Sequence, residues 1–233
     1  MSEKYGIIGA MDPEVAALVE MLENRTSEVI AGMEFFSGSF GDTQAVVVKC
    51  GMGKVNAGIC AHTLINRYGV SAVINTGVAG SLNAKLDIGD IVLSKDVIHH
   101  DVDATIFGYQ PGEVPQLGIR EFPADERLGQ LAQKICQEVI PEVKSRLGRV
   151  VSGDQFISDK GVKERLINLY QGDCAEMEGA AIAHGSYLNG IPFVILRAIS
   201  DKADDSASVD YPVFEKAAAM HCAKLVEALV AEI

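Results

Sequence analysis

The sequence predicts an α/β fold, with a central mixed and twisted sheet flanked by helices, in a single domain spanning residues 1–233. Apolar runs of strand length recur along the chain with helical stretches between them. Several runs are apolar without alternation, which is typical of strands covered by helices on both faces. The predicted strands are Tyr5–Ala10, Ala45–Cys50, Ala72–Thr76, Ile91–Ile98, Val150–Val151 and Phe193–Ile199. No linker or internal repeat divides the chain, which favours one domain.

Start signals and apolar spacing locate the helices. Asp12-Pro13 predicts an N-cap followed by proline at the first helical position. Apolar residues then recur at the spacing of one helical face, at Val15, Leu18, Val19 and Leu22. Further helices are predicted over Lys54–Tyr68, Asp125–Val139, Gly161–Tyr170, Gly179–Leu188 and Val213–Ile233.

Two segments fall outside this simple alternation. Gly32–Phe40 and Gln44–Cys50 flank Gly41-Asp42, which predicts an antiparallel hairpin and therefore a mixed sheet. The stretch Gly108–Pro123 contains three prolines and three glycines with little periodicity. It is predicted to be a long surface loop, and loops of that length are often functional.

Composition limits the kinds of partner. The chain carries 20 Lys and Arg against 32 Asp and Glu, a formal net charge of −12. The composition, with 48% hydrophobic and 22% charged residues, is typical of a globular protein and excludes a disordered chain. Nucleic acids and anionic membranes require a basic surface. Small molecules are therefore the expected ligands.

Cysteine usage indicates a reducing compartment. The five cysteines are scattered and form no C-x-x-C pair, so neither a disulfide framework nor a thiolate zinc site is predicted. We expect a cytoplasmic protein. No apolar run approaches the ~20 residues that span a bilayer. The N-terminal stretch MSEKYGIIGAMDPEV has no basic leader, so it is interpreted as a buried first strand and not as a signal peptide.

The turn Gly51–Lys54 resembles phosphate-binding motifs only superficially. A phosphate loop needs Ser or Thr after the lysine and an earlier glycine, but Val55 and Val48 occupy those positions. The dinucleotide fingerprint fails because Asn56 stands where its third glycine belongs. Two interpretations remain open: a plain tight turn, or a turn that lets the backbone approach a ligand.

The polar segment His99–Asp103 also has two interpretations. In an extended strand, His99, Asp101 and Asp103 would share one face and form a candidate metal site, with His100 facing away. One strand supplying one histidine and two carboxylates has no supporting coordination geometry. A polar or interface segment is therefore favoured, and we expect no metal and no other cofactor.

Three acidic residues lie at predicted junctions between strands and helices: Glu14, Glu178 and Asp201. In α/β sheets, ligands bind at the carboxyl ends of strands, where side chains from distant sequence positions converge. Each acid also has a purely structural interpretation. Glu14 and Glu178 would stabilise helix N-termini by about 0.3–1 kcal/mol, and Asp201 would cap the segment that follows it.

Six short motifs then occur in a recognisable order. They are Gly6–Met11 with Glu14, Gly51–Lys54, Asn75–Gly80, Ser152–Ile157, Glu176–Glu178 and Arg197–Asp201. Together they resemble the 5′-methylthioadenosine/S-adenosylhomocysteine nucleosidases of the purine nucleoside phosphorylase superfamily. The resemblance runs from about Lys4 to the C-terminal helix, and six blocks in register are far more specific than any one.

The resemblance implies a nucleoside phosphorylase-like domain with a partly barrel-like sheet, assembled as a homodimer. It implies hydrolysis of the N-glycosidic bond of 5′-methylthioadenosine and S-adenosylhomocysteine, and also of 5′-deoxyadenosine, to adenine and a 5′-substituted ribose. Carried over by position, Asp201 is the acid at purine N7 and Glu14 positions and deprotonates the attacking water. Glu178 holds the ribose hydroxyls.

The same resemblance places residues around the base and sugar. Met177 lies beside the sugar, Phe156 stacks on the base, and Gly80 lines the site. Backbone groups of Ile157 read the adenine edge, and Ser200 is counted with the substrate-binding residues.

Recognition of the 5′ group requires a pocket for an apolar thioether, for which methionine and aromatic side chains are well suited. The candidates are Met11, Met52, Met177, Phe107, Tyr109 and Tyr211. Ordinary core packing is the alternative for each methionine. In the family, the segment matching Phe107–Pro115 caps the 5′ pocket of the neighbouring subunit, and here it falls in the predicted long loop.

The chemistry supports this division of roles independently. Adenine is a poor anionic leaving group, so a positioned acid accelerates bond cleavage, typically by about 10²–10⁴-fold. Burial and the nearby acids Asp204 and Asp205 are expected to raise the pKa of Asp201. Glu14 has to be ionised, and its helix N-terminus favours the anion. A nearby carboxylate also stabilises an oxocarbenium-like transition state.

Two alternatives remain: a nucleoside phosphorylase and a non-catalytic purine-binding module. A phosphorylase neutralises a phosphate dianion, usually with arginines. Here the first turn carries Asp12 and Glu14, and the second turn carries only Lys54, so water is the favoured nucleophile.

Val78 stands where some relatives carry a hydroxyl residue, so a side-chain hydrogen bond to the acid is expected to be missing. Tyr211 replaces a frequent phenylalanine and is expected to alter tolerance at the 5′ position. The order of preference among these substrates and futalosine-type nucleosides is left open.

Overall fold

The computed structural model describes residues 3–233, and all structural statements below refer to that range. The strands are β1 (Lys4–Gly9), β2 (Glu23–Ile30), β3 (Met33–Phe40), β4 (Thr43–Lys49), β5 (Ala72–Ser81), β6 (Ile91–His99), β7 (Phe122–Pro123), β8 (Ser145–Ser152), β9 (Cys174–Glu176) and β10 (Phe193–Asp201). The helices are α1 (Asp12–Met21), α2 (Lys54–Tyr68), α3 (Glu126–Val139), α4 (Lys160–Tyr170), α5 (Gly179–Leu188) and α6 (Ala207–Glu232), with a short 3₁₀ turn η1 (Thr105–Phe107).

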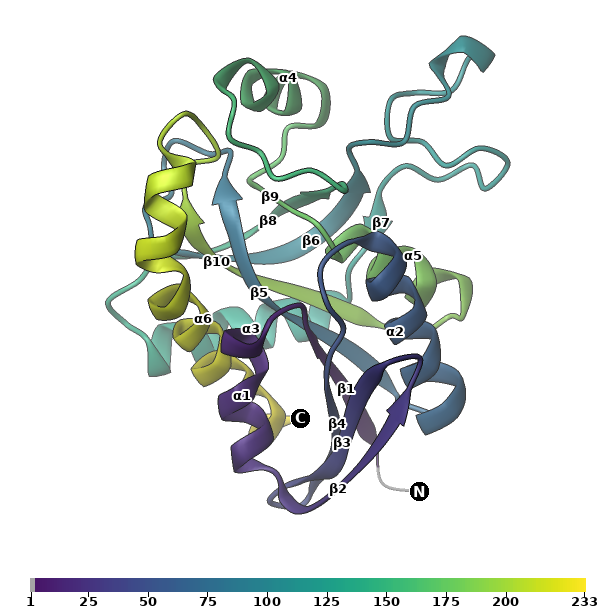
Figure 1. Cartoon of the computed structure of the whole chain (residues 1–233), viewed down its shortest axis with the longest axis vertical. Helices are drawn as coiled ribbons and strands as arrows, with labels where there is room; N and C mark the ends of the chain where they lie inside the picture. The colour runs from purple at the N-terminus through teal and green to yellow at the C-terminus, as the bar shows by residue number, and fades with distance from the viewer. Residues whose placement is uncertain (1–2) are drawn as a thin grey trace.

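The strands form one mixed sheet that closes on itself at one end. Strands β5, β9, β8, β6 and β10 hydrogen-bond in that order, and β10 pairs again with β5, so these five make a small barrel. From β5 the sheet continues through β1, β4 and β3 to β2 (Figure 1). Strands β1, β5 and β10 run parallel, and therefore their carboxyl ends meet at one edge. The predicted mixed, partly barrel-like sheet is confirmed.

Helices cover both faces of this sheet, as the unalternating apolar strands predicted. Helices α1, α3 and α6 lie on one face, and α2 packs with α5 on the other (Figure 1). Within β1, Ile7 belongs to the first core cluster and Ile8 to the second, which contains the buried side of α2. Ile74 and Val73 divide in the same way within β5. Adjacent residues of one strand thus pack into the two cores on opposite faces of the sheet.

Several features differ from the sequence-based predictions, including the short strands β7 and β9, which were not predicted. Strand β2 was not predicted, because its residues are almost all exposed and it is held by pairing with β3 and not by a core. Helix α6 begins at Ala207, before the predicted start at Val213, and it continues through Pro212. The residue at the N-cap of α1 is Met11 and not Asp12, and the exposed side chain of Asp12 pairs with Lys49.

The segment between β6 and β7 leaves the body of the molecule. It contains η1 and an isolated bridge between Val114 and Ile119, and Figure 1 shows it in teal, projecting beyond the barrel.

The predicted hairpin of β3 and β4 is antiparallel, as expected. Among the described residues, no helix is long and apolar enough to cross a bilayer.

Candidate active site

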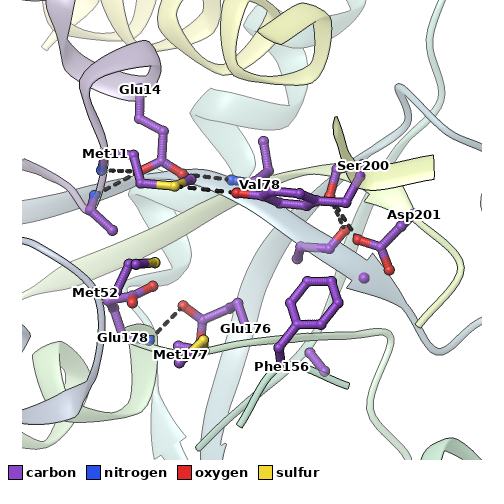
Figure 2. Close-up of a pocket in the computed structure, with 15 residues that line it drawn as sticks. Met11, Glu14, Met52, Val78, Phe156, Glu176, Met177, Glu178, Ser200 and Asp201 are labelled. Atoms are coloured by element: carbon purple, nitrogen blue, oxygen red, sulfur yellow. Dashed lines mark hydrogen bonds between the residues drawn. The ribbon is translucent and has the colours of Figure 1, made fainter. Parts of the chain in front are cut away.

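A cavity opens at the edge where the carboxyl ends of β1, β5 and β10 meet. Its volume is about 480 Å³, including the part open to solvent, which is within the usual range for small-molecule sites. The lining residues are Ala10, Met11, Glu14, Met52, Val78, Ala79, Gly80, Phe156, Ala175, Glu176, Met177, Glu178, Ser200, Asp201 and Tyr211. In Figure 2 the carboxylates of Glu14, Glu178 and Asp201 surround this one cavity from different elements.

Glu14 is buried in the first turn of α1 and is fixed by three backbone donors. One oxygen accepts hydrogen bonds from the N–H groups of Ala10 (2.6 Å) and Met11 (3.0 Å). The other accepts from the N–H of Val78 in β5 (3.1 Å). Burial raises the pKa of Glu14, while the charge of Arg197 and the backbone donors oppose that rise. The result is a well-oriented carboxylate that is more basic than usual.

Asp201 is the last residue of β10, and its carboxyl group is also held at both oxygens. The Ser200 hydroxyl donates to one oxygen (2.9 Å) and the N–H of Ala203 to the other (2.7 Å). Burial raises the pKa of Asp201, and the charges of Asp210 and Asp204 add to the rise. The expected like-charge effect is therefore present, with Asp210 in place of Asp205.

Gly80 leaves room for that carboxyl group. A Cβ atom at position 80 would lie 2.8 Å from Asp201 Oδ1 and 2.8 Å from the Cβ of Ala203. The hydroxyl contact that Val78 lacks is supplied to Asp201 by Ser200. Val78 contributes its backbone N–H to Glu14 instead, so the substitution at this position leaves both acids supported.

Glu178 occupies the N-cap position of α5 and is buried. Its Oε1 accepts a hydrogen bond from the N–H of Gly53 (2.8 Å), so the turn before α2 touches this carboxylate directly. Burial and the adjacent charge of Glu176 raise the pKa of Glu178 to about 7, against the attraction of Arg197. Of the two interpretations of the Gly51–Lys54 turn, this contact favours the one in which backbone groups serve a binding site.

A buried arginine neutralises part of this acidic cluster. Arg197 lies in β10, fully buried, and its Nη2 donates to Glu176 and to Asn75 Oδ1 (2.6 Å). The same nitrogen lies 3.7 Å from Glu178 Oε2. Gly77 provides the space, since a Cβ there would lie 2.0 Å from Arg197 Nη1 and 2.5 Å from Glu14 Oε1.

Glu176 joins this arginine to the start of α5. Its carboxylate accepts hydrogen bonds from the Ser152 hydroxyl and from the N–H groups of Glu178 (3.1 Å) and Gly179 (2.8 Å). It therefore fixes the backbone that carries Glu178. The sequence reasoning assigned no role to Glu176 or Arg197, although a charged residue inside a buried strand almost always has a partner, and that signal was available.

The apolar wall of the cavity includes side chains from five segments that are separate in sequence. The Tyr211 hydroxyl of α6 contacts Met11 Sδ (3.2 Å), and the Tyr211 ring packs edge-on against Phe156 with centroids 5.5 Å apart. Met52 and Met177 complete the lining. Phe156 remains 50% exposed, which leaves one face of its ring available for stacking.

A second recess of about 240 Å³ adjoins the main cavity next to Asp201. It shares Gly80, Phe156, Ala175, Glu176, Met177 and Asp201 with the cavity and adds Gln155, Ile157 and Ala203. Ile157, predicted at the base edge, lines only this recess, whereas Phe156 and Met177 line both compartments.

Two predicted residues, Phe107 and Tyr109, line neither the main cavity nor the adjoining recess. Phe107 is 81% exposed on the projecting segment, and Tyr109 lies on the same segment. The metal interpretation of His99–Asp103 assumed an extended strand, but β6 ends at His99. Within residues 3–233, no three histidine, cysteine or carboxylate side chains converge as a metal site.

The site therefore combines three buried carboxyl groups from different elements around one cavity of mixed polarity. Such an arrangement is able to protonate a leaving group on one side and to activate water on another. The third carboxylate offers two oxygens, which suits a vicinal diol.

Comparison with known proteins identifies the family. Residues 4–231 match the model of the phosphorylase superfamily. The chain is 44% identical over 231 residues to the 5′-methylthioadenosine/S-adenosylhomocysteine nucleosidase of Shewanella piezotolerans, covering 99% of this chain and 100% of that protein.

Solved structures with a similar fold support the same family assignment. The nucleosidase of that name from Colwellia psychrerythraea, in complex with adenine, superposes with a TM-score of 0.95 at 36% identity, covering 100% of this chain and 96% of that one. The futalosine hydrolase of Helicobacter pylori superposes with a TM-score of 0.94 at 32% identity, covering 100% and 99%. The chain belongs to the phosphorylase superfamily and, within it, to the 5′-methylthioadenosine/S-adenosylhomocysteine nucleosidases.

Proposed function

We propose that the chain hydrolyses the N-glycosidic bond of 5′-methylthioadenosine and S-adenosylhomocysteine, and of 5′-deoxyadenosine, to release adenine and the 5′-substituted ribose. The observation that carries this proposal is the meeting of Glu14, Glu178 and Asp201 around one cavity. The 44% identity to a nucleosidase acting on the first two compounds supports the same substrates here.

Asp201 acts as the general acid. It is held beside the recess that contains Ile157, where the base is proposed to bind. Its raised pKa keeps the proton available for purine N7, and transfer of that proton during bond cleavage gives a neutral adenine. Phe156 stacks on the base, and backbone groups of Ile157 read its edge.

Glu14 orients and deprotonates the attacking water. The three backbone N–H groups that bind its carboxylate fix its direction, so little reorganisation is needed when the water attacks. The negative charge of Glu14 also stabilises the oxocarbenium-like sugar that forms as adenine departs. Glu178 binds the ribose hydroxyls, with Met177 beside the sugar.

Water is favoured over phosphate as the nucleophile. The described residues that line the cavity include four carboxylates and neither lysine nor arginine. The nearby Arg197 is already paired with Glu176 and is fully buried. A phosphate dianion would therefore meet uncompensated negative charge. The alternatives of phosphorolysis and of simple purine binding both predict no adenine release when phosphate is absent.

The 5′ substituent is proposed to contact Met11, Met52, Met177 and Tyr211. The similarity in fold to a futalosine hydrolase means that the fold alone does not select the 5′ group. A comparison of kcat/KM for methylthioadenosine, S-adenosylhomocysteine, 5′-deoxyadenosine and futalosine settles this order. Adenine release from the first two at the highest kcat/KM is the expected result.

We further propose a homodimer in which the segment Phe107–Pro115 caps the 5′ pocket of the partner. Exposed apolar side chains support an interface on the α2 and α5 side of the molecule. They are Met52, Val55, Ile59, Tyr187 and Leu188, together with Ile106 and Phe107 of the projecting segment. Sedimentation at micromolar concentration is expected to give twice the mass of the chain. Monomers with full activity would contradict the proposal.

The whole chain, residues 1–233, is proposed to act as one cytoplasmic catalytic domain without a metal or other cofactor. The test of the proposed function is adenine release from methylthioadenosine by purified protein in phosphate-free buffer containing EDTA. Release by the wild type, with a loss of about 10²–10⁴-fold in Asp201→Asn and Glu14→Gln, is expected. No release by the wild type would contradict the proposal, and unimpaired variants would move the roles elsewhere.

A further inference from the structure

Three charged side chains close a ring of hydrogen bonds beside the active-site cavity. Lys54 Nζ donates to Asp101 Oδ1. Asp101 Oδ2 accepts from the backbone N–H of Asp154 (3.0 Å), and Asp154 Oδ1 accepts from the backbone N–H of Lys54 (2.8 Å). The ring therefore ties together three segments that are distant in sequence: the turn before α2, the segment after β6 and the loop after β8.

The ring is more than a solvated surface pair. The side chains of Lys54 and Asp101 are each only 19% exposed, so their interaction is less screened than that of an open ion pair. Asp154 also places a carboxylate at the N-terminus of α2, whose own first turn contains no acidic residue. Gly53 has a φ of 94°, and a Cβ there would lie 3.0 Å from Asp154 Oδ1, so a glycine is required.

Both ends of the ring continue directly into proposed substrate contacts. Gly53, the neighbour of Lys54, donates its N–H to Glu178, the proposed diol-binding residue. On the other side, Asp154 stands two residues before Phe156, the proposed base-stacking residue. The ring thus links the group that binds the sugar to the loop that binds the base.

A second contact packs the segment after β6 against the loop after β8, which carries Phe156. The His100 N–H donates to the Ser152 carbonyl (2.8 Å). A Cβ at Gly153 would lie 2.4–2.9 Å from three atoms of the buried His100 ring, so the ring packs on a residue without a side chain. Asp101 therefore projects from a fixed backbone toward both other segments.

We propose that Asp101 is a positioning residue, and that its ring with Lys54 and Asp154 sets the spacing between the diol-binding and base-binding parts of the site. This inference rests on the proposed function. If the ring sets this spacing, opening it should weaken the binding of a ligand that spans both parts of the site. It should have little effect on a fragment that binds in only one part. Adenine and 5-methylthioribose are those fragments, and methylthioadenosine is the spanning ligand.

The test measures kcat/KM for methylthioadenosine and the inhibition constants of adenine and 5-methylthioribose in Asp101→Ala and Lys54→Met. We expect kcat/KM to fall between about 10- and 100-fold, with a rise in KM, because small misplacements at a distance from the chemistry have effects of that size. The inhibition constant of each fragment is expected to change by no more than about threefold, since each needs only one part of the site. Lys54→Arg, which keeps the charge, is expected to retain most of the activity.

The same helix provides a matched control. Arg67, in the last turn of α2, pairs with Glu28 (2.9 Å), and both side chains are largely exposed. Arg67→Met and Glu28→Ala remove equivalent charges away from the ring, and they are expected to leave kcat/KM unchanged. In the double variant Asp101→Ala/Lys54→Met, the loss is expected to be no greater than in the more impaired single variant, because both changes open one ring.

Several outcomes overturn the proposal. They are an unchanged kcat/KM in both single variants, equal weakening of the fragments and the nucleoside, or additive losses in the double variant. Lys54→Met keeps the aliphatic part of the side chain, so it tests the ring even where Asp101→Ala fails to fold. Failure of the wild type to release adenine contradicts the proposed function instead, and that result is distinct from equal activity of wild type and variants.

Discussion

Arg197 and Glu176 form a buried ion pair at the wall of the cavity, between the two other glutamates of the site. Arg197 Nη2 also lies 3.7 Å from Glu178 Oε2, and Arg197 Nη1 and Glu14 Oε1 both lie against Gly77, which has no side chain to separate them. Three buried carboxylates therefore share one guanidinium. Burial raises the pKa of both Glu14 and Glu178, the charge of Glu176 adds to the rise at Glu178, and the shared arginine only partly opposes these effects.

Removal of this arginine is expected to destabilise the fold strongly. Arg197→Met leaves Glu176 buried without its ionic partner, which typically costs about 3–5 kcal/mol in the free energy of unfolding. Urea unfolding at neutral pH measures this loss. Arg67→Met, at an exposed pair, should change it by less than about 1 kcal/mol. Equal small effects of the two substitutions would contradict the account of the cluster.

Glu178 is expected to make the stability of the protein depend on pH. Its pKa rises from an ordinary 4.5 to about 7 on folding, so the folded chain holds a proton that the unfolded chain has already lost. The free energy of unfolding therefore falls as pH rises through that window. Glu178→Gln is neutral at every pH and should show a smaller fall. Urea unfolding at pH 4.5 and pH 8 tests this, and identical pH dependence in both proteins would contradict it.

Ser200 is expected to control the alkaline limb of the pH–rate profile. Its hydroxyl donates to Asp201, and such a bond favours the ionised carboxylate. Ser200→Ala removes this donor, so the pKa of Asp201 should rise further and the loss of kcat/KM at high pH should move to higher pH. Ser186→Ala is a suitable control, because the hydroxyl of that buried serine makes no hydrogen bond to the described residues. A shift to lower pH would contradict the assigned role.

Gly77 is expected to tolerate no side chain. Gly77→Ala would place a Cβ 2.0 Å from Arg197 Nη1 and 2.5 Å from Glu14 Oε1, so either the strand or both side chains have to move. Activity should fall by about 100-fold or more, as expected when a catalytic group is displaced by about 1 Å. Gly185→Ala in α5 meets only an ordinary 3.8 Å contact and serves as the control. Wild-type rates in Gly77→Ala would contradict the described packing.

Local signals in the sequence predicted much of the fold. The central strands are short apolar runs, and their burial on both faces follows from the absence of alternation, as in Val73 and Ile74. Elements that depend on partners were not predicted: β2 is exposed and exists through its pairing with β3, and β9 spans three residues. The predicted helix Val213–Ile233 starts later than α6, which begins at Ala207 and continues through Pro212.

For the site, the sequence was most informative where an acidic residue stands at a junction between a strand and a helix. Glu14, Glu178 and Asp201 occupy such positions, and the structure brings them to one cavity. The residues that tune them could not be placed, because the contacts of Arg197, Glu176 and Asp101 join segments far apart in sequence. Such contacts depend on three-dimensional packing, which spacing along one chain does not encode.

The most direct test of the central claim follows the fate of the sugar during cleavage of methylthioadenosine in water enriched in ¹⁸O, with and without phosphate. If Glu14 activates water, each turnover places one labelled oxygen on C1 of methylthioribose, and the rate is independent of phosphate. A phosphate-dependent rate that yields the sugar 1-phosphate would contradict the assignment of water as the nucleophile and of the chain as a hydrolase.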